Sequence, residues 1–395
     1  MNTFIKNNSL LSAKTKLEYT YNPNNLVIVY DTTLGNGSNT IYVPVQGTSP
    51  NVTIDWGDGL SNVYTTTGYK SHTYATSGTY VVQISGTMRT LSHSATIPVA
   101  GSKEKLIRCL SFGAIGLTSL SGAFLGCSNL ISVPDLLPTT SIITTLVSTF
   151  ESCSIFNQPL DNWNVSNVTT MSRMFFTAIN FNQSLSNWNV GRVTNFSSMF
   201  ANASAFNGDL SGWNIGANIV TPSINIGYIF LNSSFNNSSV INWNINKVTN
   251  LIGAFGDSPF NQNINNWDVS NVTNMTAVFS DAYNFNQPLN NWNTSKVTTF
   301  ANILYNADSF NQNLASWNLS GITSANGLNN FMQNAIGLST ANYDALLIGW
   351  NANKASYRTD LSPNFGGSKY SAAGASARAA LIAYGWTIID GGLAP

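Results

Sequence analysis

The residues best suited to chemistry lie near the amino end of the 395-residue chain. Asp55 and Asp58 flank a Trp-Gly step, and His72 follows shortly after them. Such a set can transfer protons, and a calcium ion on the two carboxylates is the alternative. Elsewhere the chain has one further histidine and three glutamates, with no metal-ligand cluster and no glycine-rich phosphate loop. We therefore expect no enzyme activity, no cofactor and no resident metal.

Charge is sparse and balanced, with 8% charged residues and 16 bases against 16 acids. A chain without a basic cluster does not attract nucleic acid or an anionic membrane, and no segment has the apolar length to cross a bilayer. The amino end shows no secretory signal or lipidation cysteine, and the carboxyl end no wall-sorting tail. If the protein acts outside a cell, we expect an unconventional exit, such as release within virus particles.

Seven tryptophans recur at nearly fixed spacing, each preceded by a Phe-Asn pair: Trp163, Trp188, Trp213, Trp243, Trp267, Trp292 and Trp317. Within a unit of about 25 residues, Leu185, Trp188 and Val190 have the spacing of a short strand. Val193, Phe196, Phe200 and Ala203 then follow at offsets of three and four, which predict a short helix. Because one unit cannot bury its own aromatic rings, we expect the units to stack as coils.

The asparagines of the Phe-Asn pairs should form a buried column whose side chains satisfy turn backbone groups. They are Asn157, Asn182, Asn207, Asn236, Asn261, Asn286 and Asn311. Residues 218–223 are an insertion expected to bulge from one face. Cys127 and Cys153 share a position that later carries alanine, so we interpret them as small core residues, although a disulfide between them stays open.

The repeat resembles the BspA-like leucine-rich-repeat surface proteins, in the subgroup whose coils read F-N-Q-x-L-x-x-W-N-V-S-N-V-T. The runs 161–171 and 266–275 follow this pattern almost position for position, and the resemblance covers roughly residues 105 to 335. It implies a solenoid used for adhesion or for contacts with proteins and glycans. It carries over no catalytic residue.

Residues 20–100 resemble a polycystic-kidney-disease-type (PKD) domain, an immunoglobulin-like β-sandwich. The signature parts W-G-D-G, H-x-Y and G-x-Y-x-V occur in order at residues 56–59, 72–74 and 78–82. The resemblance assigns Asp55, Asp58 and His72 to turn and inter-strand hydrogen bonds. Such domains usually serve as spacers or accessory binding modules.

The predicted fold class is therefore a β-sandwich followed by an α/β leucine-rich-repeat-like solenoid with a C-terminal capping module. Its parts are an arm at 1–19, the PKD-like domain at 20–100, the solenoid at 105–335 and the cap at 336–395. In the cap, Ser339 or Thr340 should begin a helix with an apolar face, and a second helix and a final strand should follow.

If the coils stack in this way, two rows of polar side chains point outward from the strand face. The first row is Asn164, Asn189, Asn214, Asn244, Asp268, Asn293 and Asn318, and the second includes Asn187, Asn266 and Asn291. Amide groups at regular spacing could bind sugar hydroxyls or the backbone of a partner. The alternative is a face that merely keeps the protein in solution.

Two functions fit these expectations. The first is a virion component of a bacteriophage, such as a fibre, spike or decoration protein, which contacts other virion proteins and a glycan or protein on the host surface. The second is a bacterial cell-surface adhesin. A homo-oligomer stays open, because no coiled coil imposes one.

Overall fold

The computed structural model describes residues 19–93, 100–139 and 142–395. Its contacts divide the chain into two compact units, Met1–Ile143 and Thr144–Pro395. This boundary falls inside the stretch predicted as the solenoid, and the predicted domain boundaries themselves stay predictions. The predicted arm lies outside the described residues, except for Tyr19.

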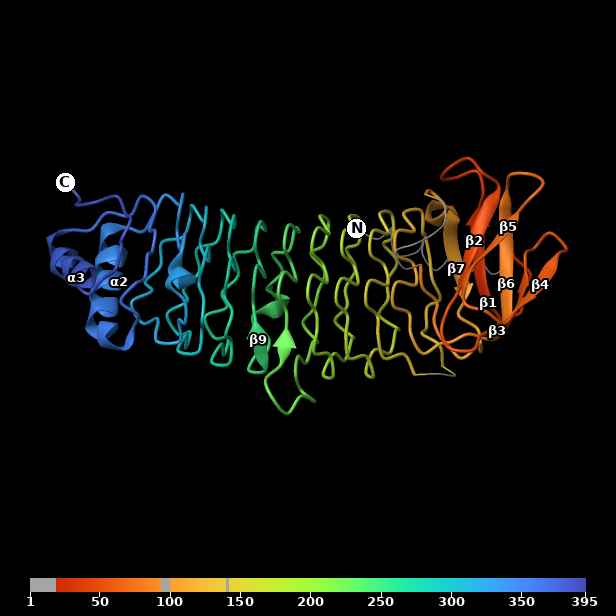
Figure 1. Cartoon of the computed structure of the whole chain (residues 1–395), viewed down its shortest axis with the longest axis horizontal. Coiled ribbons are helices and arrows are strands. Elements are labelled where there is room, and N and C mark those ends of the chain that lie inside the picture. Colours follow the sequence, from red (N-terminus) through yellow and green to blue (C-terminus); the bar gives the residue numbers. More distant parts are fainter. Residues whose placement is uncertain (1–18, 94–99, 140–141) are drawn as a thin grey trace, which may run out of the picture. The chain divides into compact units, whose positions relative to one another are not determined.

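The first unit contains seven described strands, shown at the red and orange end of the chain in Figure 1. They are β1 Leu26–Asp31, β2 Thr40–Val45, β3 Asn51–Asp55, β4 Ser61–Tyr64, β5 Gly68–Thr73, β6 Thr79–Thr87 and β7 Leu106–Ser111, with the 3-10 turn η1 Lys103–Lys105 before the last. Five form one sheet in the order β4-β3-β6-β1-β7, and β2 pairs with β5. Strand β1 lies inside this sheet, paired on one edge with β6 and on the other with β7, and five of its six residues are buried.

Strand β7 belongs both to this sheet and to the first coil. Its outer edge forms a parallel bridge from Arg108 to Ser132, and Cys109 N donates to Ser132 O at 2.9 Å. The residues from Leu106, where the sequence predicts the start of the coils, therefore form the edge strand of the sheet as well as the first coil.

In the second unit, short elements interrupt a stack of coils, which Figure 1 shows between β9 and the carboxyl end. They are β8 Ile224–Asn225, β9 Val248–Asn250, η2 Ser238–Val240, η3 Ala325–Leu328, α2 Thr340–Asn353, η4 Lys354–Ser356 and α3 Ala372–Ala383. Most neighbouring coils meet through single parallel bridges, such as Thr145 to Thr170 and Thr170 to Asn195. We call residues 144–338 the repeat array.

The predicted fold class is wrong. In the described residues the strands of the first unit form one five-stranded and one two-stranded sheet, rather than a clear β-sandwich. The repeat array contains no α-helix, and isolated bridges and one two-stranded pair stand where an α/β solenoid would carry a continuous sheet. The two α-helices of the described chain both follow the array.

Backbone hydrogen bonds explain why the predicted helices do not form. The amides of Met171, Arg173 and Phe175 each donate to a carbonyl of the next coil at 2.9 Å. The amides of Met174 and Phe176, which alternate with them, donate three residues back at 3.1 Å. An α-helix would satisfy every amide four residues back within its own coil. The three-and-four spacing of apolar residues thus comes from turns whose alternate amides bond between coils.

Each of these turn segments also contains two residues with left-handed backbone, four positions apart. Arg173 and Thr177 have φ 58°, and Ser198 and Asn202 have φ 56° and 58°. Such a conformation costs an L-residue about 1–2 kcal/mol and interrupts an α-helix. Gly253 takes the same position in a later coil, with φ 58°.

The core of the array is a set of aromatic columns. Phe181 stacks on Phe156 with ring centroids 6.1 Å apart and on Phe206 at 6.0 Å, nearly parallel in both cases. A second column runs beside it, in which Phe175 and Phe200 lie 5.5 Å apart. Each buried ring contributes roughly 2–3 kcal/mol by removal of apolar area from water.

Every described tryptophan from Trp188 to Trp350 also reaches into the preceding coil. Trp188 Nε1 donates to Leu160 O at 2.9 Å, and Trp213 Nε1 to Leu185 O at 3.0 Å. The same bond recurs at Trp243, Trp267, Trp292, Trp317 and Trp350. The indole therefore fills the core and gives a second hydrogen bond to a turn carbonyl that already accepts a backbone amide of its own coil, as Leu160 O does from Trp163 N at 3.0 Å.

The carboxyl-terminal helices follow the sequence prediction closely. Ser339 caps α2, because its side chain accepts from Asn342 N, and the predicted apolar face is buried: Tyr343, Leu346, Leu347 and Trp350. Helix α3 packs against α2. The predicted final strand is reduced to one parallel bridge between Asn364 and Ile389.

Candidate functional site

The carboxylates and imidazole singled out in the sequence are used within the first unit. Asp55 Oδ1 accepts from Gly57 N at 3.0 Å, and Asp58 Oδ1 from Leu60 N at 3.1 Å. Asp58 Oδ2 lies 2.7 Å from His72 Nε2, and the imidazole stacks on Trp56. These are the turn and inter-strand hydrogen bonds that the resemblance implies.

Burial acts to raise the pKa of Asp58, but the hydrogen bonds from His72 and from the Leu60 amide outweigh it and lower that pKa below its ordinary value. The carboxylate is therefore held in its charged form, tied to the imidazole and the turn. A proton-transferring acid would need the opposite shift.

The two predicted polar rows are exposed throughout. Asn164, Asn189, Asn214, Asn244, Asp268, Asn293 and Asn318 all lie on the surface, as do Asn187, Asn266 and Asn291. They sit in turns rather than on strands, so the predicted strand face is absent although the outward orientation is present.

In the first row the side-chain oxygen is occupied within the coil. Asn164 Oδ1 accepts from Ser166 N at 3.2 Å, Asp268 Oδ1 from Ser270 N at 3.0 Å and Asn318 Oδ1 from Ser320 N at 2.8 Å. The same turn forms at Asn189, Asn244 and Asn293. Because Oδ1 faces the backbone, each free amide of the row presents its NH₂ group to solvent.

Asn214 links two coils instead. Its Oδ1 accepts from Val190 N and its Nδ2 donates to Asn189 Oδ1, both at 3.0 Å. In the second row, the side chains of Asn187, Asn266 and Asn291 make no hydrogen bond to another described residue. These three amides therefore keep both donor and acceptor groups toward solvent.

The column of Phe-Asn asparagines forms as predicted, but it is half-buried to exposed rather than buried. Asn182 N donates to Asn157 Oδ1 at 2.9 Å, and the same bond links each member to the next as far as Ser339 N on Asn311 Oδ1. The sequence analysis missed the glutamine that follows: Gln183 Nε2 donates to Asn157 Oδ1 at 2.8 Å. The recurrence of the Phe-Asn-Gln triplet in the sequence could have indicated that this glutamine takes part in the column.

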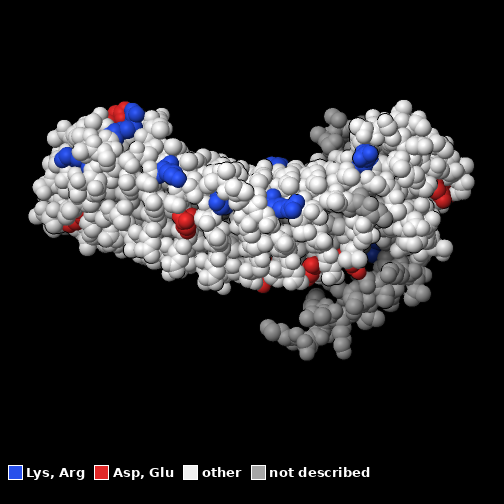
Figure 2. Space-filling model, turned by 90° about the horizontal axis from the view of Figure 1, so that it is seen from below, with Lys and Arg blue, Asp and Glu red and all other residues white. Residues whose placement is uncertain are grey.

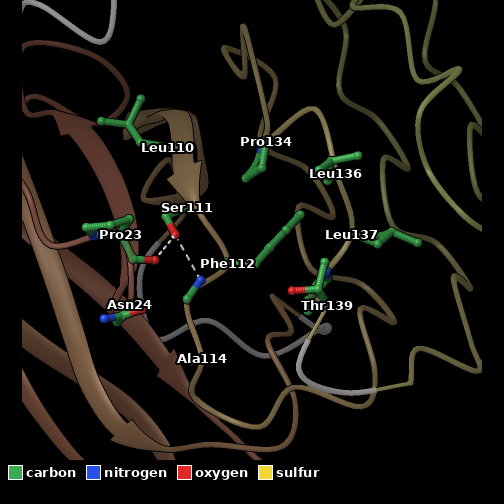
Figure 3. A pocket seen from close by; sticks show the side chains of 12 residues that line it. Pro23, Asn24, Leu110, Ser111, Phe112, Ala114, Pro134, Leu136, Leu137 and Thr139 are labelled. Atoms are coloured by element: carbon green, nitrogen blue, oxygen red, sulfur yellow. Dashed lines mark hydrogen bonds between the residues drawn. The ribbon is translucent and has the colours of Figure 1, made fainter.

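The first unit has a hollow of about 270 Å³ beside the end of β7, shown in Figure 3. Ser111 Oγ donates to Pro23 O at 2.7 Å and accepts from Gly113 N, so the nearest polar side chain is already bonded. The remaining lining is mainly apolar, including Leu136 and Leu137. It lacks the converging polar groups of a small-molecule site.

Within the described residues none of the three cysteines forms a disulfide, and all three are buried, as the core interpretation requires. Burial raises the pKa of Cys127 to about 12, so its thiol stays protonated and unreactive. Within the described residues, no three His, Cys, Asp or Glu side chains come together where a metal ion could bind. None of the described helices has the length and apolar character needed to cross a membrane. The insertion at 218–223 is exposed and projects from one edge in Figure 1.

Comparison with known proteins gives one result. No curated protein and no solved structure matches the chain. A family described as "Mycoplasma protein of unknown function, DUF285" matches residues 118–223 and 224–340. The match does not reach residues 20–100, so the PKD resemblance stays a prediction. It supports a repeat-containing surface protein, and because it covers more than half of the 395 residues, the chain belongs to the DUF285 family.

Proposed function

We propose that this protein is a non-catalytic surface protein whose repeat array attaches to a glycan or protein partner through the two exposed amide rows. The observation that carries the proposal is the geometry of the first row. In five of its seven members the side-chain oxygen accepts from the backbone and the NH₂ group is left toward solvent: Asn164, Asn189, Asn244, Asn293 and Asn318.

Donors that recur along the array suit a ligand with recurring acceptors, such as the hydroxyl and ring oxygens of a polysaccharide. The scaffold beneath the rows is well determined, because the aromatic columns and the indole hydrogen bonds fix each coil against the next. Binding would therefore cost little ordering of the protein.

The attachment test uses amides that have no structural task. In the N266A/N291A variant two exposed side chains of adjacent coils are removed, and neither makes a hydrogen bond to another described residue. N180A/N284A is the matched control, since both of its asparagines are exposed at another position of the repeat.

Glycan arrays and intact host cells are the binding targets, with urea unfolding as the check on folding. We expect N266A/N291A to lose at least tenfold in binding while its unfolding midpoint and the control's binding stay at the wild-type level. Equal binding by both variants would sink the proposal.

For location we propose the surface of a bacteriophage virion, with the bacterial cell surface as the alternative. The family match is compatible with either. Mass spectrometry of purified particles and of washed cell surfaces separates them: peptides of this chain in particles support the virion location, and peptides on cell surfaces alone support the adhesin.

A further inference from the structure

The cations of the repeat array are concentrated at one position of the repeat. Residues 144–338 contain four Lys and Arg residues, and three of them, Arg192, Lys247 and Lys296, each directly precede the buried valine that begins a turn segment. The fourth, Arg173, lies elsewhere in the repeat and is paired with Glu151. In a chain with 8% charged residues, three cations in one register form a defined feature, which we call the cationic row.

The cationic row has a regular spacing. Arg192 belongs to the coil of Trp188, Lys247 to that of Trp243 and Lys296 to that of Trp292, so one further coil separates each pair. Adjacent hydrogen-bonded backbones lie roughly 4.8 Å apart, which places successive cations about 10 Å apart. The row therefore runs along the stack with a two-coil period.

The three cations remain available for a ligand. Arg192 is exposed and bonds to no other described side chain or backbone group. Lys247 Nζ donates to Val220 O at 2.9 Å and Lys296 Nζ to Asn271 Oδ1 at 2.7 Å, both neutral oxygens. An ammonium group has three donors, so each lysine keeps free donors and an unneutralised charge. In Figure 2 most of the molecular surface is uncharged, and the blue groups stand apart from one another.

The amide rows lie on the same turn as the cationic row. Asn189 is three residues before Arg192, Asn244 three before Lys247 and Asn293 three before Lys296. Each of these asparagines presents its NH₂ group outward beside a positive charge. One turn thus offers donors for hydroxyl groups together with a partner for an anion.

We propose that the cationic row and the neighbouring amides bind an acidic polysaccharide, an extended chain with a carboxylate or sulfate group on alternate sugars. The proposal rests on the proposed function and names its ligand class. An acidic group on every second sugar matches cations on every second coil, and the intervening hydroxyls meet the amide donors. The insertion at 218–223 stands between Arg192 and Lys247, so the ligand contacts one cation on one side of it and two on the other.

Nucleic acid fits this surface less well. Duplex DNA carries one charge per about 1.7 Å of axis, whereas the row supplies a cation only about every 10 Å. The row also offers no exposed aromatic platform for unstacked bases. Asp268 is the one acid in the amide rows, and it lies in the coil between Lys247 and Lys296.

The test measures binding of the full chain to heparin and to alginate, with dextran as the neutral probe and double-stranded DNA as the competing polyanion. The row variant is R192Q/K247Q/K296Q. The control variant R89Q/K354Q/K369Q removes the same number of charges from outside the row. D268N tests the sign of the local charge.

We expect the wild type to bind at least one acidic glycan more tightly than dextran or DNA, with affinity that falls as salt rises. The affinity of the row variant for the acidic glycan should fall at least tenfold and that of the control variant less than twofold. The affinity of D268N should rise severalfold. The inference would be overturned by any of three results: equal losses of affinity in the row and control variants, no binding of the wild type to either acidic glycan, or tighter binding of the wild type to DNA. The proposed function fails separately, on the N266A/N291A attachment test.

Discussion

The sheet of the first unit and the repeat array hold their backbones together in different ways. In the first unit, buried polar groups beside the sheet make contacts that occur once: Lys105 Nζ donates to Ser38 O and Thr40 O, and His93 Nδ1 bonds to Ala123 O. In the array the same indole bond and the same asparagine bond recur in nearly every coil. Stability in the sheet thus depends on individual buried polar groups, and in the array on repeated ones.

The largest expected effect comes from removing one tryptophan of the repeat array, Trp292, whose ring stacks on that of Trp317 with centroids 6.2 Å apart. Trp292→Ala should cost about 3–5 kcal/mol, because it leaves a cavity and removes the hydrogen bond from Trp292 Nε1 to Ile264 O, which keeps only the amide of Trp267. Trp292→Phe should cost about 1–2 kcal/mol, since most of the packing remains. Urea unfolding followed by circular dichroism measures both. A loss below 1 kcal/mol for the alanine variant would contradict the columnar core.

The sheet unit should instead show a pH dependence centred on His93. Burial lowers the pKa of His93 to about 4, despite its bond to Ala123 O, and Lys103 lowers it further. The ordinary value near 6.5 applies when the chain unfolds, so stability is complete above pH 6.5 and declines as the pH falls toward 4. The total loss is about 3 kcal/mol.

Hydrogen exchange in peptides from β1 and β6, corrected for the intrinsic rate at each pH, measures this loss. His93→Leu removes the titrating group and should flatten the profile between pH 6.5 and 4. A wild-type profile that is already flat would show that the imidazole is hydrated in the folded state.

A smaller effect is expected from the asparagine column. Asn286 Oδ1 accepts from Asn311 N at 2.9 Å and from Gln312 Nε2 at 2.7 Å. Asn286→Ala should cost about 1–2 kcal/mol, because a backbone amide loses its partner at a half-buried site. The exposed neighbour Asn284 is the control, and Asn284→Ala should stay within about 0.5 kcal/mol of wild type in urea unfolding. Equal effects would mean that water replaces the bond.

The smallest expected effect is an increase in the stability of the repeat array. Ala277 has φ 55°, in the turn position that Gly253 occupies one coil earlier. Ala277→Gly should stabilise the array by about 0.5–1 kcal/mol, since the left-handed conformation is strained for alanine. Ala205→Gly, where the backbone is not left-handed, should destabilise it instead. Thermal unfolding of the two variants tests the opposite signs.

The sequence predicts the columns better than it predicts the backbone. Trp188, Phe181 and Asn182 recur in register, and register is what determines which side chains stack. The stripe of Val193, Phe196 and Phe200 was misinterpreted as a helix because apolar spacing alone does not reveal whether an amide bonds within its coil or to the next. Asn202 and Gly253 tolerate left-handed backbone and therefore indicated turns, whereas Ser198, Arg173 and Thr177 at equivalent positions gave no such signal.

For the surface amides, the sequence predicts exposure but not side-chain orientation. Outward orientation of Asn189 and Asn266 follows from their place beside a buried tryptophan, so their exposure could be deduced. The inward rotation of Asn189 Oδ1 onto Gly191 N could not, because it depends on a turn geometry that the helix-and-strand interpretation did not contain. The cationic row appears only when the coils are aligned on their turns.

The hydrogen bond that links successive members of the asparagine column also links its last member to α2. Ser339 N and Asn342 Nδ2, at the start of α2, donate to Asn311 Oδ1 as the amides of a further coil would. The helix therefore accepts any preceding coil of this type, whatever its number in the series. In genetic terms, gain or loss of one unit of about 75 nucleotides by unequal recombination would leave every junction chemically intact. The length of the repeat array can thus change by one coil at a time, because the contact between the last coil and α2 stays the same.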